Sequence, residues 1–312
     1  MRVLKVTVAI VSKQEPSLAD TLDAIGSPGP DTPVDEILVV DASGGELDWI
    51  RDTRPWVKWI DFVPPVQPRV TIAHQRNIAV RAAIGDVVVF IDCGCVPQAH
   101  WLERLLGPLV NDGEAVTCGP ARSDKPSVYS GSRWWGNTDA AYVSAAPTIN
   151  IAFRRDAYEA IGGFDESFAT AEDLDFTWRL TDAGYRLRWV ADAIVQPDWG
   201  GPRRQLRRSL AYGRGWVRLL RKHPHRILAT AHNTPIPFVY PIFILGLPLT
   251  LKWRAYPALL LIPLWRARNE SQPWLVIADH LLVGLGALVE LAAPKQSALS
   301  RTRPEAGIST PP

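Results

Sequence analysis

The chain has 312 residues, enough for one large domain or for a domain with an appendage. Its apolar share of 47% is typical of globular proteins, and its net charge of +2 gives no indication of a nucleic-acid-binding protein. The three cysteines, Cys93, Cys95 and Cys118, are too few for a disulfide framework and indicate a reducing compartment.

The N-terminal residues, MRVLKVTVAIVSKQEP, combine a charged start with a short β-branched run. That run contains Lys5, and no small-residue cleavage site follows it before the polar SKQEP. We therefore expect a first β-strand here rather than a signal peptide.

Apolar strand patterns alternate with helical patterns along the first half of the chain. Strands are predicted at residues 6–12, 36–40, 57–62, 87–91, 115–119 and 148–153, and helices at 17–25, 71–84, 100–110 and 173–190. This alternation predicts an α/β protein with a parallel sheet. Ligands of such sheets bind outside the carboxyl ends of the strands, so Ser12, Asp41 and Asp92 are expected to share one crevice.

Two further stretches are predicted to lie outside the regular elements. Residues 123–147 are polar and aromatic and are expected to form a long surface loop over the site. Residues 296–312 have the composition of a disordered tail.

The segment FDESFATAEDLD, residues 164–175, places Glu172 and Asp173 where a loop becomes a helix. A carboxylate at this place can take a proton from a hydroxyl group. The alternative is structural: Thr170 to Asp173 fits a capping box, and Asp175 with Arg179 fits an i,i+4 ion pair. The segment alone does not decide between the two interpretations.

The C-terminal part changes in composition. Residues 235–251 and 255–265 are uncharged, and only Asp279, His280 and Glu290 are ionisable in residues 274–293. Tryptophans, lysines and arginines flank these segments as interfacial anchors would. Membrane-spanning, re-entrant or in-plane helices fit this pattern, and so does a helical subdomain packed on the core.

Several motifs recur in one order that is specific to a known family. They include AHQRNIAVRAAIGDVVVFID, residues 73–92, and GGFDE…AEDLDFTWRL, residues 162–180. On these residues the sequence resembles the family 2 glycosyltransferases over roughly residues 6–215. The resemblance implies a GT-A (Rossmann-like), mostly parallel sheet with flanking helices, followed here by a C-terminal apolar helical segment.

The resemblance implies donor-binding roles for residues at the strand ends. Ser12 and Asp41 would hold the nucleotide base and ribose, because a carboxylate accepts hydrogen bonds from a base N–H or from ribose hydroxyls. Arg76 would approach the base or the phosphates, and Asp92 would contact the ribose. A turn-forming role for Asp41 and a solvated position for Arg76 are the structural alternatives.

The chain departs from the family at its usual metal ligands. Asp92 starts the D-x-D motif, with Cys93 next to it on the donor side, but Gly94 stands where the second acid is expected. A histidine common in the family is also missing near Gln196 and Pro197. A hard cation such as Mg²⁺ or Mn²⁺ needs oxygen ligands, so we expect activity that depends weakly or not at all on metal. Cys93 and Cys95 are better explained as small buried cysteines than as a soft-metal pair.

In the family, the residue that matches Asp173 is the catalytic base, and Glu172 would orient it or the acceptor. The Q-x-x-R-W motif of processive members is present only as QLRRS, residues 205–209, without the tryptophan, which favours transfer of a single sugar. Arg208 and Arg214 could stabilise the departing diphosphate in place of a metal.

These observations divide the chain into a catalytic domain, residues 1–226, a membrane-associated or transmembrane helical region, residues 227–295, and the tail. The basic residues at 203–226 favour a cytoplasmic catalytic domain at the cell membrane. We expect a nucleotide-sugar donor and a hydroxyl acceptor, lipid-linked or in the cell envelope. The rivals are a degenerate relative that binds a nucleotide or a partner without catalysis, and a soluble enzyme whose C-terminal helices form a dimer.

Overall fold

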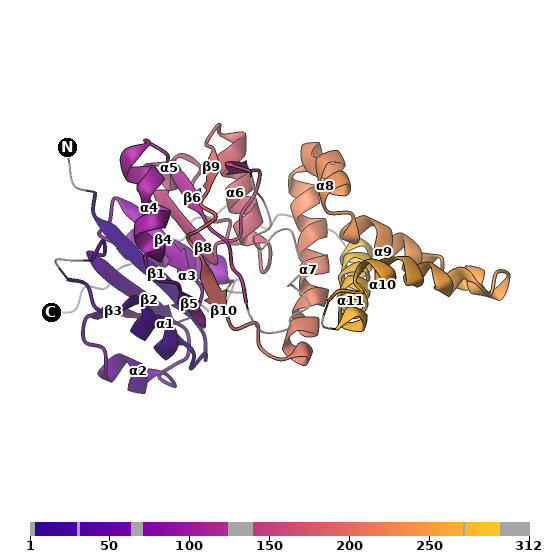
Figure 1. The fold of residues 1–312 in the computed structure, drawn as a ribbon, viewed down its shortest axis with the longest axis horizontal. Coiled ribbons are helices and arrows are strands. Elements are labelled where there is room, and N and C mark those ends of the chain that lie inside the picture. Colours follow the sequence, from indigo (N-terminus) through magenta and orange to yellow (C-terminus); the bar gives the residue numbers. More distant parts are fainter. Residues whose placement is uncertain (1–3, 30–31, 64–70, 124–139, 271, 294–312) are drawn as a thin grey trace.

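The computed structural model describes residues 4–29, 32–63, 71–123, 140–270 and 272–293 (Figure 1). Its centre is an eight-stranded sheet in the order β3-β2-β1-β4-β8-β6-β9-β7. The helices that follow the sheet in the sequence, from α7 onward, form a second body on one side of it. The predicted α/β architecture, a mostly parallel sheet with flanking helices and a C-terminal apolar helical segment, is therefore confirmed.

Four parallel strands form the first half of the sheet: β1 (Val6–Ser12), β2 (Glu36–Asp41), β3 (Val57–Asp61) and β4 (Val87–Ile91). Strands β1, β2 and β4 are buried along their whole length because helices cover both faces of the sheet. This explains their continuous runs of valine and isoleucine.

The second half of the sheet is mixed. Strand β8 (Asn150–Arg154) runs antiparallel to both β4 and β6 (Val116–Cys118). Beyond it, β9 (Leu187–Trp189) pairs parallel with β6, and β7 (Tyr142–Val143) closes the edge antiparallel to β9. A separate pair, β5 (Cys95–Pro97) and β10 (Val195–Pro197), lies just after the end of β4.

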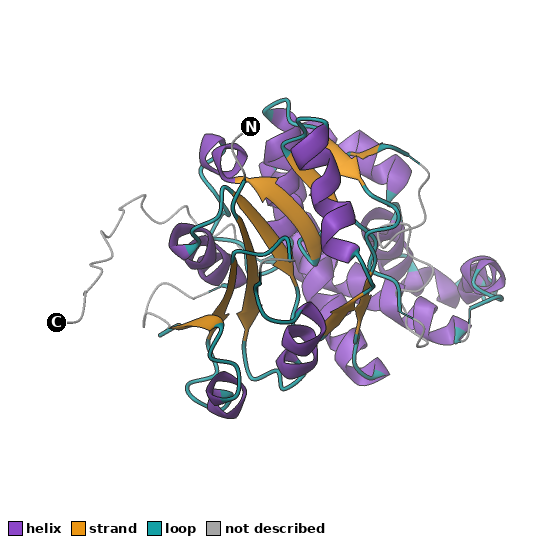
Figure 2. Ribbon diagram, turned by 60° about the vertical axis from the view of Figure 1, so that its left-hand side comes forward, coloured by secondary structure: helices purple, strands orange, loops and turns teal. Residues whose placement is uncertain are grey.

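Helices cover the two faces of the sheet with two apolar cores (Figure 2). On one face, α1 (Leu18–Ile25) and α4 (Trp101–Asn111) pack on the β1 side chains of Val6, Val8 and Ile10. The other face carries α3 (Ile72–Ala82), α5 (Arg155–Ala160) and α6 (Glu172–Asp182). The short α2 (Asp48–Asp52) contributes Ile50 to the first core. These layers hold the N-terminal ends of α3 and α6 near the carboxyl ends of the parallel strands.

The predicted helix at residues 173–190 is too long. Helix α6 ends at Asp182, and residues 187–189 form strand β9. Leu187 and Trp189 point into the second core, while Arg188 between them is less buried. In the sequence, the alternating burial of a strand therefore follows closely after the periodic pattern of a helix. The pairing of β9 with β6 decides the local structure there, and this pairing partner is distant in the sequence.

Helix α7 (Pro202–Lys222) joins the sheet to the C-terminal helices (Figure 1). It crosses α11 (Pro273–Ala292) at very short range, because a Cβ at Gly213 would collide with the carbonyl oxygen of Val283, and a Cβ at Gly286 with that of Leu210. Arg214 and Arg218 of α7 also bind Glu290 of α11, at 3.1 and 2.8 Å. The last helix is thus fixed to the helix that follows the catalytic fold.

The other C-terminal elements are short: η2 (Pro224–Arg226), α8 (Ile227–Asn233), α9 (Ile236–Leu245), η3 (Leu247–Leu251), η4 (Tyr256–Leu260) and α10 (Leu261–Arg266). The apolar segment 235–251 is therefore broken, and the 10 residues of α9 extend about 15 Å, too short to cross a bilayer. Among the described residues only α11 is long and apolar enough to span a membrane, with a mean hydropathy of 1.9 and 39% of that stretch buried.

Two further predictions lie largely or wholly outside the described residues. They concern the loop at 123–147, of which residues 124–139 are not described, and the tail at 296–312. Both stay predictions.

Two glycine-to-alanine substitutions, one at the α7–α11 crossing and one away from it, test how closely the helices pack. Gly286→Ala places a methyl group against the carbonyl of Leu210, so we expect it to lower the free energy of unfolding by about 1–3 kcal/mol. Gly107→Ala in α4 meets open space, so we expect no loss and a gain of up to about 1 kcal/mol. Urea or thermal unfolding measures both variants, and equal stability of the two would contradict the tight crossing.

Candidate active site

The carboxyl ends of the central strands meet as the sequence predicts. Ser12 and Asp41 are direct register partners of β1 and β2. The side-chain amide of Gln75, from α3, donates to the backbone carbonyl of Ser12 at 3.1 Å. The thiol of Cys93, just beyond β4, lies 3.8 Å from the hydroxyl of Ser12. These three strand ends therefore form one connected corner.

Asp41 adopts the turn geometry that was the alternative to a binding role. Its carboxylate accepts hydrogen bonds from the backbone N–H of Ser43 at 3.1 Å and from the Ser43 hydroxyl at 2.5 Å. The side chain is almost fully buried. The turn fixes the carboxylate at the end of β2, and contact with a nucleotide stays a prediction.

The N-terminus of α6 carries Glu172 and Asp173, and the capping-box alternative is wrong. The N-cap residue is Ala171, which makes no side-chain cap, so Thr170 and Asp173 form no capping box, although Asp173 does accept a hydrogen bond from the N–H of Leu174. The hydroxyl of Thr170 instead donates to the carbonyl of Ala211 in α7, at 3.2 Å. Ala171 has a left-handed φ of 66°, which a residue with a Cβ adopts at a cost on the order of 1 kcal/mol. Backbone strain of this kind clusters at functional sites.

Arg76 of α3 connects the motifs. Its guanidinium donates to Glu172 Oε1 at 2.5 Å and lies 3.4 Å from Asp92 Oδ1. The rings of Phe90 and Phe164 flank it at 5.9 and 5.7 Å from the guanidinium carbon. Burial opposes the charge of Arg76, but Glu172 and Asp92 outweigh it and raise the pKa of the guanidinium above its usual value.

Arg76 is therefore not the solvated helix residue of the structural alternative, since only 3% of it is exposed. Its two bound carboxylates hold it between α6 and the end of β4. Its expected approach to a base or phosphate stays a prediction.

Asp173 has the electrostatics of a general base. Burial raises the pKa of its carboxyl to about 7, the charge of Glu172 adds to this effect, and Arg76 opposes it. One oxygen accepts a hydrogen bond from the backbone N–H of Leu174 at 2.8 Å. A carboxylate that titrates near neutral pH can both accept a proton and release it.

Helix α7 adds Arg208 and Tyr212 to the site. The sequence analysis indicated Arg208 but not Tyr212. Burial raises the pKa of Tyr212 to about 12, while the charge of Arg208 opposes the shift and those of Asp173, Asp92 and Glu172 reinforce it. The Tyr212 hydroxyl thus lies within electrostatic range of all four groups. Tyr212 follows Arg208 by four residues, one helical turn, so both face the same way.

Arg214 does not join Arg208. Its guanidinium binds Glu290 of α11, so the sequence-based expectation that it faces the diphosphate is wrong. Other cations of the basic segment 203–226 are also paired, among them Arg204 with Glu15 and Lys222 with Asp165 and Asp175. The segment is thus largely a set of internal ion pairs and much less a free positive surface.

The residues at the position where the family usually binds its metal do not fit a metal site. Gly94 has a φ of 84°, and a Cβ there would lie 2.8 Å from the Ser17 hydroxyl. Of the D-x-D pair only Asp92 supplies a carboxylate, and one of its oxygens already faces Arg76. Gln196 and Pro197 lie in β10, which pairs with β5.

The cysteines of this turn behave as buried thiols. Burial raises the pKa of Cys93 to about 12 and that of Cys95 well above its usual range, so neither is a thiolate at neutral pH. Metal ligation requires the thiolate. Cys95 is buried and Cys93 is partly buried, so the interpretation as a small buried residue fits Cys95 fully and Cys93 in part.

Sequence reasoning missed one acid close to the metal position. The backbone N–H of Asp198 donates to the carbonyl of Gly94 at 3.0 Å, and its side chain is exposed. Asp198 follows the aligned Gln196–Pro197 position by one residue, so a search that allowed a one-residue shift would have found it.

Comparisons with known proteins identify the family of the chain. The family model described as "Glycosyl transferase family 2" matches residues 7–162, and the one described as "Glycosyl transferase family group 2" matches residues 132–289. Each match covers half of the chain or slightly more. The chain belongs to the family 2 glycosyltransferases.

Curated relatives of this glycosyltransferase include the pre-mycofactocin glycosyltransferase of Mycobacterium tuberculosis, 32% identical over 171 residues. That alignment covers 49% of this chain but only 36% of the mycobacterial protein. The succinoglycan biosynthesis protein ExoA of Rhizobium meliloti is 27% identical over 238 residues, covering 69% of this chain and 66% of ExoA.

Among solved structures, the mannosyltransferase PcManGT from Pyrobaculum calidifontis, in complex with GDP-Man and Mn²⁺, superposes with a TM-score of 0.63. It is 19% identical, and the match covers 93% of this chain and 87% of PcManGT. At this identity the likeness shows that the glycosyltransferase shares the GT-A fold.

The raised pKa of Asp173 has a consequence for stability. Because the folded-state pKa lies near 7 and the ordinary value is 3.8, ionising Asp173 destabilises the fold increasingly as pH rises between these values. We expect Asp173→Asn to stabilise the protein, by an amount on the order of 1 kcal/mol at pH 8 and by less at pH 5.5. Urea unfolding at both pH values measures this, and a loss of stability at both would indicate a structural role.

Proposed function

We propose that this glycosyltransferase moves a single sugar from a nucleotide-sugar donor to a hydroxyl of a lipid-linked or cell-envelope acceptor, with inversion at the anomeric carbon. The observation that carries the proposal is the arrangement at the start of α6. There Asp173 titrates near pH 7 beside a Glu172 that Arg76 holds in place.

In the proposed reaction Asp173 accepts the proton of the acceptor hydroxyl. The hydroxyl oxygen forms a bond to the anomeric carbon as the bond from that carbon to the diphosphate oxygen breaks, and the nucleoside diphosphate leaves with the electron pair. One displacement inverts the anomeric configuration. Glu172 is held by its ion pair with Arg76, so its role is to orient Asp173, and its charge helps to keep the pKa of Asp173 high.

The donor is proposed to lie at the corner of the strand ends. Asp41, fixed by Ser43, would accept hydrogen bonds from the base or ribose beside Ser12. Asp92, whose side chain is 41% exposed, would contact the ribose, with Cys93 and Gly94 along the donor. Each assignment rests on the resemblance together with the position of the residue.

The departing diphosphate carries negative charge that some group must stabilise. We assign this role to Arg208, which comes from α7 to the same side as Tyr212 and the three carboxylates. No step is assigned to a metal, because the residues at the D-x-D position supply one carboxylate where the family has two.

Transfer of a single sugar is proposed because α7 carries only part of the Q-x-x-R-W motif of processive members. Ser209 stands where processive members have tryptophan, and its buried hydroxyl donates to Asp279 of α11 at 2.5 Å. Gln205 donates to the carbonyl of Gly200 at 2.7 Å. Both residues of the partial motif therefore fix α7, Ser209 to α11 and Gln205 to the turn before α7.

A membrane surface is the proposed place of action. Leu228, Leu251 and Trp265 expose 84%, 90% and 64% of their surface. Lys252, Arg254, Arg266 and Arg268 adjoin this apolar surface, and Arg268 stacks on Trp265. Such a surface fits the headgroup region of an anionic leaflet. Because the sugar-nucleotide donor is expected in the cytosol, we place the enzyme on the cytoplasmic face of the membrane.

The activity prediction uses a panel of UDP-, GDP- and dTDP-sugars, each tested with and without EDTA. We expect turnover of one donor class that survives EDTA, and Asp173→Asn to lower it by about two to four orders of magnitude without loss of donor binding. Asp112→Asn, an exposed acid at the end of α4, is the matched control.

The other outcomes of this experiment are informative. Nucleotide binding without turnover by the wild type would favour a degenerate binding protein, which Gly94 motivates. Full loss in EDTA, reversed by Mn²⁺, would show that Asp92 recruits other ligands, with Asp198 the first to test.

The membrane prediction uses a charge placed on the apolar surface. Leu251→Asp should reduce binding to anionic vesicles at least about tenfold, because burying this side chain in the interface contributes about 1.5–3 kcal/mol. Val63→Asp is the control, since Val63 is 83% exposed but lies in the catalytic fold. Vesicle co-sedimentation measures both, and a wild type that stays in the supernatant would contradict the proposal.

A further inference from the structure

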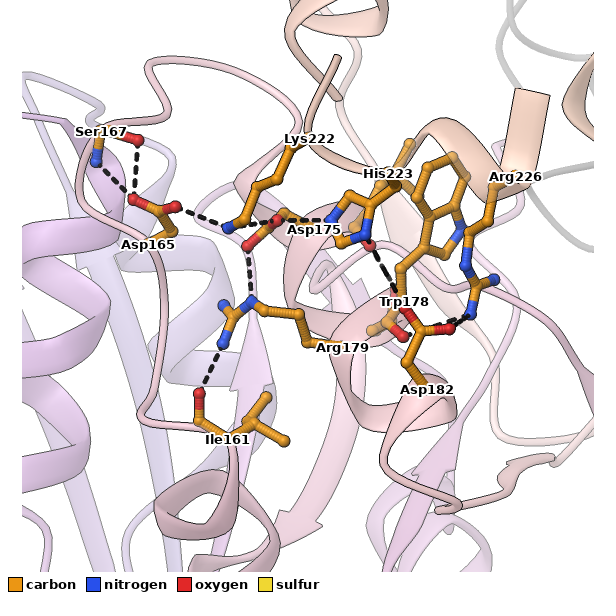
Figure 3. A network of polar contacts seen from close by, with 12 residues as sticks. Ile161, Asp165, Ser167, Asp175, Trp178, Arg179, Asp182, Lys222, His223 and Arg226 are labelled. Atoms are coloured by element: carbon orange, nitrogen blue, oxygen red, sulfur yellow. Dashed lines mark hydrogen bonds and ion pairs between the residues drawn. The ribbon is translucent and has the colours of Figure 1, made fainter. Parts of the chain in front are cut away.

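A second group of polar side chains lies outside the active site, where the end of α6 meets the turn after α7 (Figure 3). Asp182 is the last residue of α6, and His223 and His225 follow Lys222, the last residue of α7. One ligand atom from each of the three lies within 4.8 Å of the other two. These atoms are a carboxylate oxygen and two imidazole nitrogens, the ligand types that Zn²⁺ prefers.

The separations fit a tetrahedral ion. Bond lengths of about 2.0–2.2 Å in a tetrahedral site place neighbouring ligand atoms about 3.4 Å apart. Oδ2 of Asp182 lies 3.3 Å from Nε2 of His225 and 3.7 Å from Nδ1 of His223. The two histidine nitrogens lie within 4.8 Å of each other, so small side-chain rotations would bring all three ligand atoms around a common ion.

His223 is oriented as metal-ligating histidines are. Its Nε2 lies 2.8 Å from Oδ1 of the fully buried Asp175, so Nε2–H donates to that carboxylate. The other ring nitrogen, Nδ1, faces Oδ2 of Asp182 at 3.7 Å. A carboxylate behind the histidine is the usual support of a metal ligand.

The surrounding groups hold the ligands in place. Arg179 fixes Asp175 from the other side at 2.8 Å. Arg226 binds Oδ1 of Asp182 at 2.5 Å and stacks over Trp178, which leaves Oδ2 for an ion (Figure 3). His223 is 6% exposed and His225 58%, so the site has a buried anchor and an open side.

We infer that Asp182, His223 and His225 bind one Zn²⁺ ion, with water as the fourth ligand. The ion fastens the turn after α7 to the end of α6. It reinforces the ion pairs that Asp175 and Asp182 already form with Lys222 and Arg226, so we expect sugar transfer to survive removal of the ion by EDTA. The site is separate from the D-x-D position and goes beyond the proposed transfer reaction.

The test uses the full chain without an affinity tag, because a histidine tag binds zinc. The protein is dialysed against EDTA, freed of chelator and titrated with Zn²⁺ alone by calorimetry, and bound zinc is counted by elemental analysis. We expect about one Zn²⁺ per chain, and His225→Ala and Asp182→Asn should each weaken its binding at least about tenfold.

His232→Ala is the matched control, because His232 is exposed on the neighbouring helix α8 and is no ligand. Circular dichroism establishes that His225→Ala is folded, as its exposed side chain leads us to expect. Zinc uptake well below one ion per chain overturns the inference. Equal affinity in His225→Ala and His232→Ala also overturns it.

Discussion

The buried guanidinium of Arg76 is the interaction on which the site depends. A charge in that position is very costly unless it is paired, and its partners come from two other elements, Glu172 at the start of α6 and Asp92 after β4. Three segments far apart in the sequence must therefore converge on one point. The left-handed Ala171 is part of the same arrangement, since it is the N-cap of α6 and directly precedes Glu172 and Asp173, the first two residues of the helix.

The catalytic fold and the C-terminal helices are joined by one helix. Helix α7 touches the loop before α6 through Thr170, brings Tyr212 and Arg208 to the carboxylates, and packs against α11 through Gly213. Removing the residues after 226 would strip α11 from α7 and expose its apolar and charged contacts. The boundary expected from composition thus cuts through a packed unit, and the division of the chain into separate domains stays a prediction.

Much of the fold could be read from the sequence. The valine-rich strands and the helices between them follow from local periodicity, and the motifs around Asp92 and Asp173 were sufficient to recognise the family. The incorrect predictions have a common cause: contacts with residues far away in the sequence decide the structure there, against the preference of the local sequence. Strand β9 was read as helix because its partner β6 is about 70 residues away. Tyr212 and the pairing of Arg214 with Glu290 depend on how two helices cross, which no local pattern records.

Gly94 has a consequence for how this site could change over generations. Its φ of 84° suits glycine, and any side chain there would approach Ser17. An aspartate at this position would carry a backbone cost on the order of 1 kcal/mol or more before it contributed anything to metal binding. An acid at position 94 would therefore need a shift of the Ser17 side chain as well as a left-handed backbone. The present turn thus favours a site with a single carboxylate.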